Sequence, residues 1–127
     1  MIIAVDFDGT IVQHTFPEIG EPMDGAFATL KRWQHYGHKL ILWTCRNNTD
    51  PALNGRKVLT EAVEFCKANG LVFDAVNENL NNLGFCPTPK IYADVYVDDR
   101  SIDQLGFISW SFFDGLLIDI ERNIKAK

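Results

Sequence analysis

The sequence predicts an α/β fold of the three-layer, Rossmann-like kind, with a central parallel sheet and helices on both faces. Short apolar runs alternate with stretches of helical periodicity, which is the βαβ pattern of such folds. Polar or acidic residues directly follow several of the apolar runs. A chain of 127 residues, 46% hydrophobic and 23% charged, is typical of one globular domain, so residues 1–127 are expected to form a single domain.

The first half of the chain contains two expected strands and one expected helix. Residues Ile2–Asp6 are apolar up to the aspartate, as in a parallel strand covered on both faces. Residues 12–22 are polar, with two prolines and a glycine, and predict a loop or small hairpin. Apolar residues recur at three- and four-residue steps over 26–33, which predicts a helix that Gly37 ends. Residues Leu40–Trp43 form the second expected strand, which leads into a polar loop.

The second half continues the alternation. A helix is expected to open at Asp50-Pro51, because aspartate caps helices and proline suits the first helical position. Residues Leu71–Val76 predict the third strand, 77–89 a loop, and Val95–Val97 the fourth strand. A last helix is rich in bulky apolar residues: Trp110, Phe112, Phe113, Leu116, Leu117, Ile118, Ile120 and Ile124. This helix either packs entirely on the sheet or also pairs with a second copy, so a homo-oligomer is one hypothesis.

Composition narrows the classes of partner and compartment. A net charge of −5 leaves no basic face for phosphates, which argues against nucleic acid as a partner. No apolar run approaches the roughly 20 residues of a membrane span, so no membrane is expected. The first apolar run has no basic flank and contains Asp6, unlike a signal peptide. The cysteines have no C-x-x-C spacing, and we expect a cytoplasmic protein with reduced thiols at Cys45, Cys66 and Cys86.

Acidic and hydroxyl residues lie where expected strands end. The carboxyl ends of parallel strands meet at one edge of the sheet, where ligands bind in open α/β folds. Any one of these residues could simply begin a turn, but together they place four carboxylates on one rim: Asp6, Asp8, Asp98 and Asp99, beside Thr44. Two carboxylates about 4 Å apart repel by roughly 4 kcal/mol at an effective dielectric constant of 20. A divalent cation relieves this repulsion, and oxygen-only ligands favour magnesium over zinc, which predicts a metal site for phosphoryl chemistry.

The same residues resemble the four ordered motifs of the haloacid dehalogenase-like (HAD) phosphohydrolase superfamily. They are Asp6-Phe7-Asp8-Gly9-Thr10 after a strand, Thr44 closing the second, Lys90, and Asp98-Asp99 closing a later one. The resemblance covers nearly the whole chain and is closest to small bacterial and phage members with "WTCR" and "YVDDR"-like motifs. It implies a capless, Mg²⁺-dependent phosphoric monoester hydrolase that forms an aspartyl-phosphate.

The resemblance also implies roles for individual residues. Asp6 would be the nucleophile, and Asp8 would protonate the leaving oxygen and then activate water. Magnesium would be held by Asp6, by Asp98 and by the backbone carbonyl of Asp8. Asp99 would either contact the metal through water or hold the lysine. Residues expected to bind the substrate or to shape the turn around it are Gly9, Thr10, Thr44, Cys45, Arg46 and Lys90.

Lys90 is the expected phosphate-binding cation, and Lys57 and Arg56 are its rivals. Lys90 precedes Asp98 by eight residues, about 26 Å along a fully extended strand. It reaches the rim only if residues 87–93 fold back as a loop.

The chain leaves no room for a cap domain, so the expected site is open. Residues 12–22, called the flap below, and the loop at residues 77–89 are each only about a dozen residues long, and a neighbouring subunit could provide a lid instead. An open site admits a small phosphorylated substrate and also a bulky one. Further candidate contacts are His14, Phe16, Asn47 and Asn48.

Other functions compete with this one. A receiver-like phospho-acceptor uses similar residues, but its acid pair comes at the first strand and its lysine last, the reverse of the order here. An inactive HAD-fold interaction module would be expected to have lost one of the acids. Asp8 and the absence of a cap disfavour dehalogenase and phosphonate chemistry. A cysteine phosphatase needs Cys-x5-Arg, and position 51 is Pro51.

Overall fold

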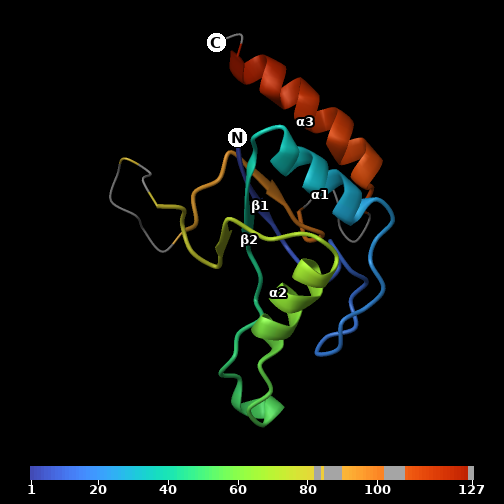
Figure 1. The fold of residues 1–127 in the computed structure, drawn as a ribbon, viewed down its shortest axis with the longest axis vertical. Helices are drawn as coiled ribbons and strands as arrows, with labels where there is room; N and C mark the ends of the chain where they lie inside the picture. Colours follow the sequence, from blue (N-terminus) through green and yellow to red (C-terminus); the bar gives the residue numbers. More distant parts are fainter. Residues whose placement is uncertain (82–83, 85–89, 102–107, 126–127) are drawn as a thin grey trace.

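The computed structural model describes residues 1–81, 84, 90–101 and 108–125 of the chain. Its centre is a four-stranded parallel sheet in the order β3-β2-β1-β4 (Figure 1). The strands are β1 (Ile2–Val5), β2 (Lys39–Leu42), β3 (Ala75–Val76) and β4 (Val95–Val97). The helices are α1 (Ala26–His35), α2 (Val58–Ala68) and α3 (Trp110–Lys125), with a short 3₁₀ helix, η1 (Pro51–Leu53). The expected α/β, Rossmann-like class is confirmed.

The strand order creates a switch point beside β1. The chain runs from β1 outward to β2 and β3, and then returns to the other side of β1 as β4. β1 therefore pairs with two strands, with Val5 opposite both Leu42 and Val97. The N–H of Asp6 donates to the carbonyl of Val97 (3.0 Å), which extends the pairing one residue beyond β1. In open α/β sheets such a switch point, at the carboxyl ends of the strands, is where ligands bind.

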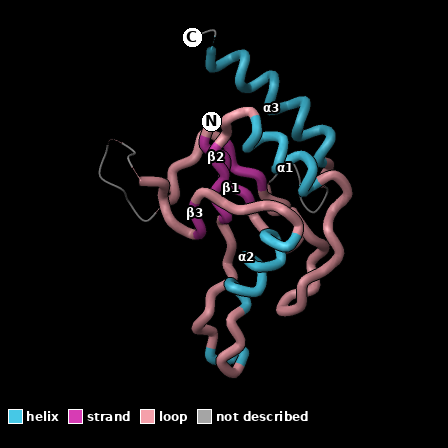
Figure 2. The backbone as a smooth tube through the Cα atoms, viewed as in Figure 1, coloured by secondary structure: helices cyan, strands magenta, loops and turns pink. Residues whose placement is uncertain are grey.

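One face of the sheet packs against the helices. Alternate strand residues such as Ile3, Val5 and Leu42 share one buried cluster with residues of all three helices, among them Leu30, Trp33, Ala62, Cys66, Trp110, Phe113 and Leu117. α1 and α3 lie side by side (Figure 2), with the rings of Trp33 and Trp110 5.8 Å apart.

The opposite face of the sheet is covered differently. Ala4 and Ile41 point to that face and pack against Ile91 and Ala93, which belong to the connection between β3 and β4. The described part of that connection contains no helix. The expected helical cover is thus present on one face, whereas over the described residues loop structure covers the other.

β1 and β2 differ from their expected bounds by no more than a single residue at either end, whereas two other elements differ by more. Asp50 caps a helix as expected, because its Oδ1 accepts the N–H of Ala52 (2.9 Å). This helix is only the short η1, which is followed by Asn54 with a φ of 52°. α2 begins separately at Val58. β3 is shorter than expected, because the N–H of Leu71 closes the end of α2 by donating to Cys66 and only Ala75–Val76 pair with β2.

α3 buries one side and exposes another. Trp110, Phe113 and Leu117 are buried, whereas Phe112 and Ile118 are about half exposed, at 58% and 48%. The hypothesis of a homo-oligomer through this helix stays a prediction. No helix in the described part of the chain has the length and apolar character needed to cross a membrane.

Candidate functional site

The turn after β1 holds Asp6 and Asp8 at the carboxyl end of the strand. The carbonyl of Phe7 accepts hydrogen bonds from the next turn, including the N–H of Ile11 (2.9 Å), so the chain reverses immediately after the strand. The Phe7 ring is fully buried and meets Phe65 of α2 edge-on, with ring centroids 6.4 Å apart. The two aspartates therefore flank a residue whose ring is anchored in the core, and this anchor holds both of them at the end of the strand.

Three of the four expected carboxylates form a cluster at the switch point. Asp6, Asp98 and Asp99 each offer a carboxylate oxygen, and these oxygens all lie within 4.8 Å of one another. The Thr10 hydroxyl donates to Asp6 Oδ2 (3.2 Å) and accepts the N–H of Asp99 (3.1 Å), which ties β1 to the end of β4. Gly9 has a φ of +83°, and a Cβ there would lie 2.3 Å from Asp99 Oδ2. The positive φ therefore favours glycine at this position, and a larger residue would have to displace the Asp99 carboxylate.

The electrostatics of this cluster favour a bound cation. Burial, followed by the charge of Asp98, raises the pKa of Asp6 to about 7. Burial and the contact with Asp98 also raise the pKa of Asp99. Without a cation the cluster therefore resists carrying its full negative charge near neutral pH. A divalent cation would favour the ionised carboxylates, and three oxygen donors suit magnesium.

A cavity of about 330 Å³ opens beside the cluster. Its lining combines expected catalytic residues with loop residues from the flap and from the ends of β2 and β4: Asp6, Asp8, His14, Phe16, Thr44, Cys45, Arg46, Asp98 and Arg100. The Thr44 hydroxyl accepts the N–H of Arg46 (3.1 Å), and its own proton goes to no described residue. Thr44 can therefore donate a hydrogen bond into the cavity.

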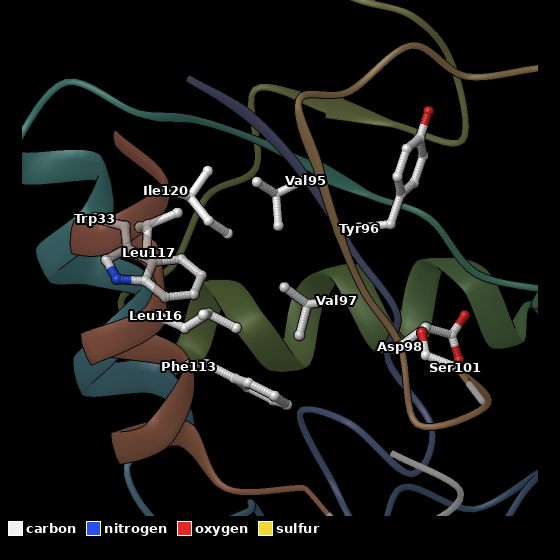
Figure 3. Close-up of a pocket in the computed structure, with 10 residues that line it drawn as sticks. All are labelled: Trp33, Val95, Tyr96, Val97, Asp98, Ser101, Phe113, Leu116, Leu117 and Ile120. Carbon is white, nitrogen blue, oxygen red and sulfur yellow. The ribbon is translucent and has the colours of Figure 1, made fainter. Parts of the chain in front are cut away.

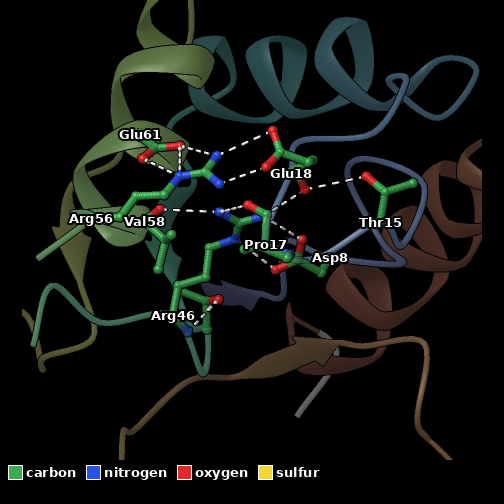
Figure 4. Close-up of polar contacts among 9 residues, drawn as sticks. Asp8, Thr15, Pro17, Glu18, Arg46, Arg56, Val58 and Glu61 are labelled. Carbon is green, nitrogen blue, oxygen red and sulfur yellow. Dashed lines mark hydrogen bonds and ion pairs between the residues drawn. The ribbon is translucent and has the colours of Figure 1, made fainter. Parts of the chain in front are cut away.

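Asp8 lines the cavity but pairs with Arg46 instead of joining the cluster. Arg46 Nε donates to Asp8 Oδ2 and Arg46 Nη2 donates to Asp8 Oδ1, each at 2.8 Å (Figure 4). The remaining guanidinium N–H groups donate to the carbonyls of Pro17, Glu18 and Val58, at 3.1–3.3 Å. The Arg46 side chain is fully buried. The expectation that Arg46 contacts the substrate therefore differs from the structure, in which all five donors are used within the protein.

The expected phosphate-binding cations lie elsewhere. Lys90 is exposed, and its Nζ lies 5.7 Å from the centroid of the Tyr96 ring, outside the residues that line the cavity. Arg56 is engaged by the carboxylates of Glu18 and Glu61. Lys57 directly precedes α2 and also does not line the cavity.

Sequence reasoning did not single out three residues that shape the site. The Asn77 side chain accepts the N–H of Thr44 (2.8 Å) and donates to the Arg46 carbonyl (3.4 Å). Trp110 Nε1 donates to the Thr10 carbonyl (2.9 Å) and so links α3 to the turn after β1. The third, Arg100, lines the cavity, and its guanidinium bonds to no described residue. Asn77 and Arg100 both follow the end of a strand, and this position was also the reason for predicting the aspartates as site residues. No local sequence pattern predicts that Trp110 contacts the site.

A second cavity, of about 110 Å³, lies between β4 and α3. Figure 3 shows Val95 and Val97 pointing toward the aromatic and aliphatic side chains of α3, while Tyr96 points away. Of the described residues, Asp98 alone lines both cavities. Because the rest of this lining is apolar or weakly polar, the candidate chemistry belongs to the cavity beside the carboxylates.

The fold and the site together define an α/β protein with a cluster of carboxylates at the switch point of a parallel sheet. The solved structure of a conserved protein coded by a locus of Bacteroides thetaiotaomicron is similar to this chain, with 38% sequence identity and a TM-score of 0.79. The similarity covers 94% of this chain and 90% of that one, so the chain belongs to the same family as that protein. No family model matches the chain, and no curated protein matches it.

Proposed function

We propose that the protein is a magnesium-dependent phosphomonoesterase of the HAD type, which acts through an aspartyl-phosphate on Asp6. The observation that carries the proposal is the cluster of Asp6, Asp98 and Asp99, with carboxylate oxygens within 4.8 Å of one another at the switch point. The Thr44 hydroxyl on the same cavity supports it. A partly buried set of close acids without a cation is costly, whereas a phosphatase site needs such a set.

Asp6, Asp98 and Asp99 would hold the Mg²⁺ ion, together with the backbone carbonyl of Asp8. The ion would supply positive charge for the phosphoryl oxygens, as metals do in phosphoryl transfer. The donor set is compatible with this role, because magnesium prefers carboxylate and carbonyl oxygen.

Asp6 lines the cavity and would attack the phosphorus atom in line. A carboxylate oxygen of Asp6 would form the new bond to phosphorus while the bond to the leaving oxygen breaks. Asp8 would give a proton to that oxygen and later take one from the water that hydrolyses the aspartyl-phosphate. Each carboxylate oxygen has two lone pairs, so the hydrogen bonds from Arg46 leave capacity on the Asp8 oxygens that line the cavity.

Arg100 is the cation that we propose for contact with the phosphoryl group, in place of Lys90. It lines the cavity with Asp6 and Asp98, and its side chain bonds to no described residue. Its backbone N–H donates to Asp98 Oδ1 (2.8 Å), which fixes the start of the side chain beside the cluster. A guanidinium suits phosphate oxygens because it offers several donors in one plane.

The proposed substrate class is based on the open cavity and on the lack of a cap domain among the described residues. Residues 12–22 are the described cover nearest to the carboxylates, and the Phe16 side chain is 41% exposed at the cavity. We propose a small phosphorylated substrate, with room for a bulky group that extends into solvent.

The experiment is hydrolysis of p-nitrophenyl phosphate with and without Mg²⁺. We expect Mg²⁺-dependent turnover by the wild-type protein and a loss of about 10³-fold or more in Asp6→Asn, because the nucleophile is removed. Asp24→Asn is the matched control, since Asp24 is exposed and does not line this cavity. Retained activity in Asp6→Asn would contradict the mechanism, and an inactive wild-type protein would favour an interaction module.

A further inference from the structure

Arg46 joins three separate segments through one guanidinium. Two of its N–H groups donate to the carboxylate of Asp8, two to the flap carbonyls of Pro17 and Glu18, and one to the carbonyl of Val58 at the start of α2 (Figure 4). An arginine side chain has five N–H donors, so all of them are engaged. The aspartate that borders the cavity and the loop that covers it are therefore held by the same group.

The surroundings of Arg46 leave it little freedom. Its Cζ lies 5.1 Å from the ring centroids of both Phe7 and Phe16, and the side chain is fully buried. The paired bonds to Asp8 fix the plane of the carboxylate as well as its position, which a lysine with its single ammonium group cannot do.

We infer that Arg46 is a positioning residue that fixes the Asp8 carboxylate toward the cavity and couples its orientation to the flap. The inference rests on the proposed function, because Asp8 has a chemical step only in that reaction. In that step the bond between phosphorus and the leaving oxygen breaks, and the proton of Asp8 moves to the leaving oxygen. Arg46 itself exchanges no proton and contacts no reacting atom.

This role predicts a loss that depends on the leaving group. A nitrophenolate departs readily without a proton, whereas the alkoxide of glycerol needs one. Loosening Asp8 should therefore lower kcat/KM, which reports the steps up to departure of the leaving group, far more for glycerol 2-phosphate than for p-nitrophenyl phosphate. A purely structural role of Arg46 would lower both activities by the same factor.

The test compares Arg46→Lys, Asp8→Asn and the double variant with both substrates in the presence of Mg²⁺. Arg32→Lys is the matched control, because Arg32 forms a more exposed ion pair with Asp114 away from the cavity. Thermal unfolding of each variant identifies the temperature range in which it is folded. The comparison of the two substrates within Arg46→Lys does not depend on the other variants.

We expect Arg46→Lys to lower kcat/KM by about 10²-fold for glycerol 2-phosphate and by less than about threefold for p-nitrophenyl phosphate, because kcat/KM covers only the steps up to departure of the leaving group and excludes hydrolysis of the aspartyl-phosphate. In the Asp8→Asn background the same substitution should have no further effect, because the two residues act as a unit. Equal losses for the two substrates, or a full additional loss in the double variant, would overturn the inference alone. If the wild-type protein hydrolyses neither substrate, the proposed function fails and the inference fails with it.

Discussion

At the scale of single residues, Gly9 shows how closely the turn after β1 approaches the end of β4. Its φ of +83° is rare for other residues, and a Cβ would lie 2.3 Å from Asp99 Oδ2. Gly37 has a similar φ of +95° but no heavy atom within 4 Å of an added Cβ. The two glycines therefore separate the cost of backbone conformation from the cost of the clash.

Gly9→Ala is expected to lower the free energy of unfolding by about 1–3 kcal/mol more than Gly37→Ala, because only the first substitution also displaces a carboxylate. Urea denaturation of both variants at one pH measures the difference. Equal losses for the two variants would show that Asp99 moves aside at no cost.

Asp6 should make the stability of the metal-free protein depend on pH. Burial and then Asp98 raise its pKa to about 7 from 3.8, so between these values the folded state holds a proton that the unfolded state has released. The free energy of unfolding therefore falls as pH rises through this window. In EDTA, we expect the wild-type protein to lose more stability than Asp6→Asn between pH 5 and pH 7.5. The same pH slope in both proteins would contradict the raised pKa.

At the scale of elements, α3 stabilises the turn after β1 although no residue of α3 lines the cavity beside the carboxylates. The buried indole N–H of Trp110 donates to the Thr10 carbonyl, and Thr10 in turn contacts Asp6 and Asp99. The last helix thus does more than cover the sheet, because it also holds the turn that follows Asp6.

Trp110→Phe is expected to lower the free energy of unfolding by about 1–3 kcal/mol, because the Thr10 carbonyl loses its buried partner. It should also weaken Mg²⁺-dependent activity through displacement of Asp6. Trp43→Phe is the control, since Trp43 is 38% exposed and its indole N–H donates to no described residue. A Trp110→Phe protein as stable as the Trp43→Phe protein would show that the bond is not structural.

At the scale of the whole molecule, the sequence was enough to predict where the acids meet. Asp6 and Asp98 follow strands whose apolar runs are visible in the sequence, and in a parallel sheet the carboxyl ends of such strands lie at one edge. The cluster follows from this topology. The strand order, which places β4 beside β1, required the structure.

The partner of Asp8 could not be predicted in this way. Arg46 lies 38 residues from Asp8 and was expected to contact substrate, because a polar residue after a strand usually faces the ligand. Its burial depends on the flap and on the start of α2, which close around it through backbone carbonyls. Every residue has a backbone carbonyl, so the pattern of side chains does not predict which carbonyls accept hydrogen bonds from a buried guanidinium.

Lys90 shows a related limit. Its place in the order of motifs matches a family pattern, but Ile91 and Ala93 bury themselves against the sheet and Lys90 itself lies over Tyr96. Arg100 borders the acids instead.

The two cations can be distinguished by replacing each with alanine. Arg100→Ala should raise KM for p-nitrophenyl phosphate strongly, because Arg100 lines the cavity, whereas Lys90→Ala should raise it little. The reverse order would restore Lys90 as the phosphate-binding cation.

The central claim is that Asp6 carries the phosphoryl group during turnover. The most direct measurement is acid quenching of the Asp8→Asn variant during reaction with radiolabelled p-nitrophenyl phosphate, whose leaving group needs no proton from Asp8, and Mg²⁺, followed by peptide mapping of the label. In this variant the activation of water is impaired, so we expect the aspartyl-phosphate to accumulate with the label on Asp6 and to be absent from Asp6→Asn. Label on any other residue, or hydrolysis of the monoester with no labelled protein, would contradict the account.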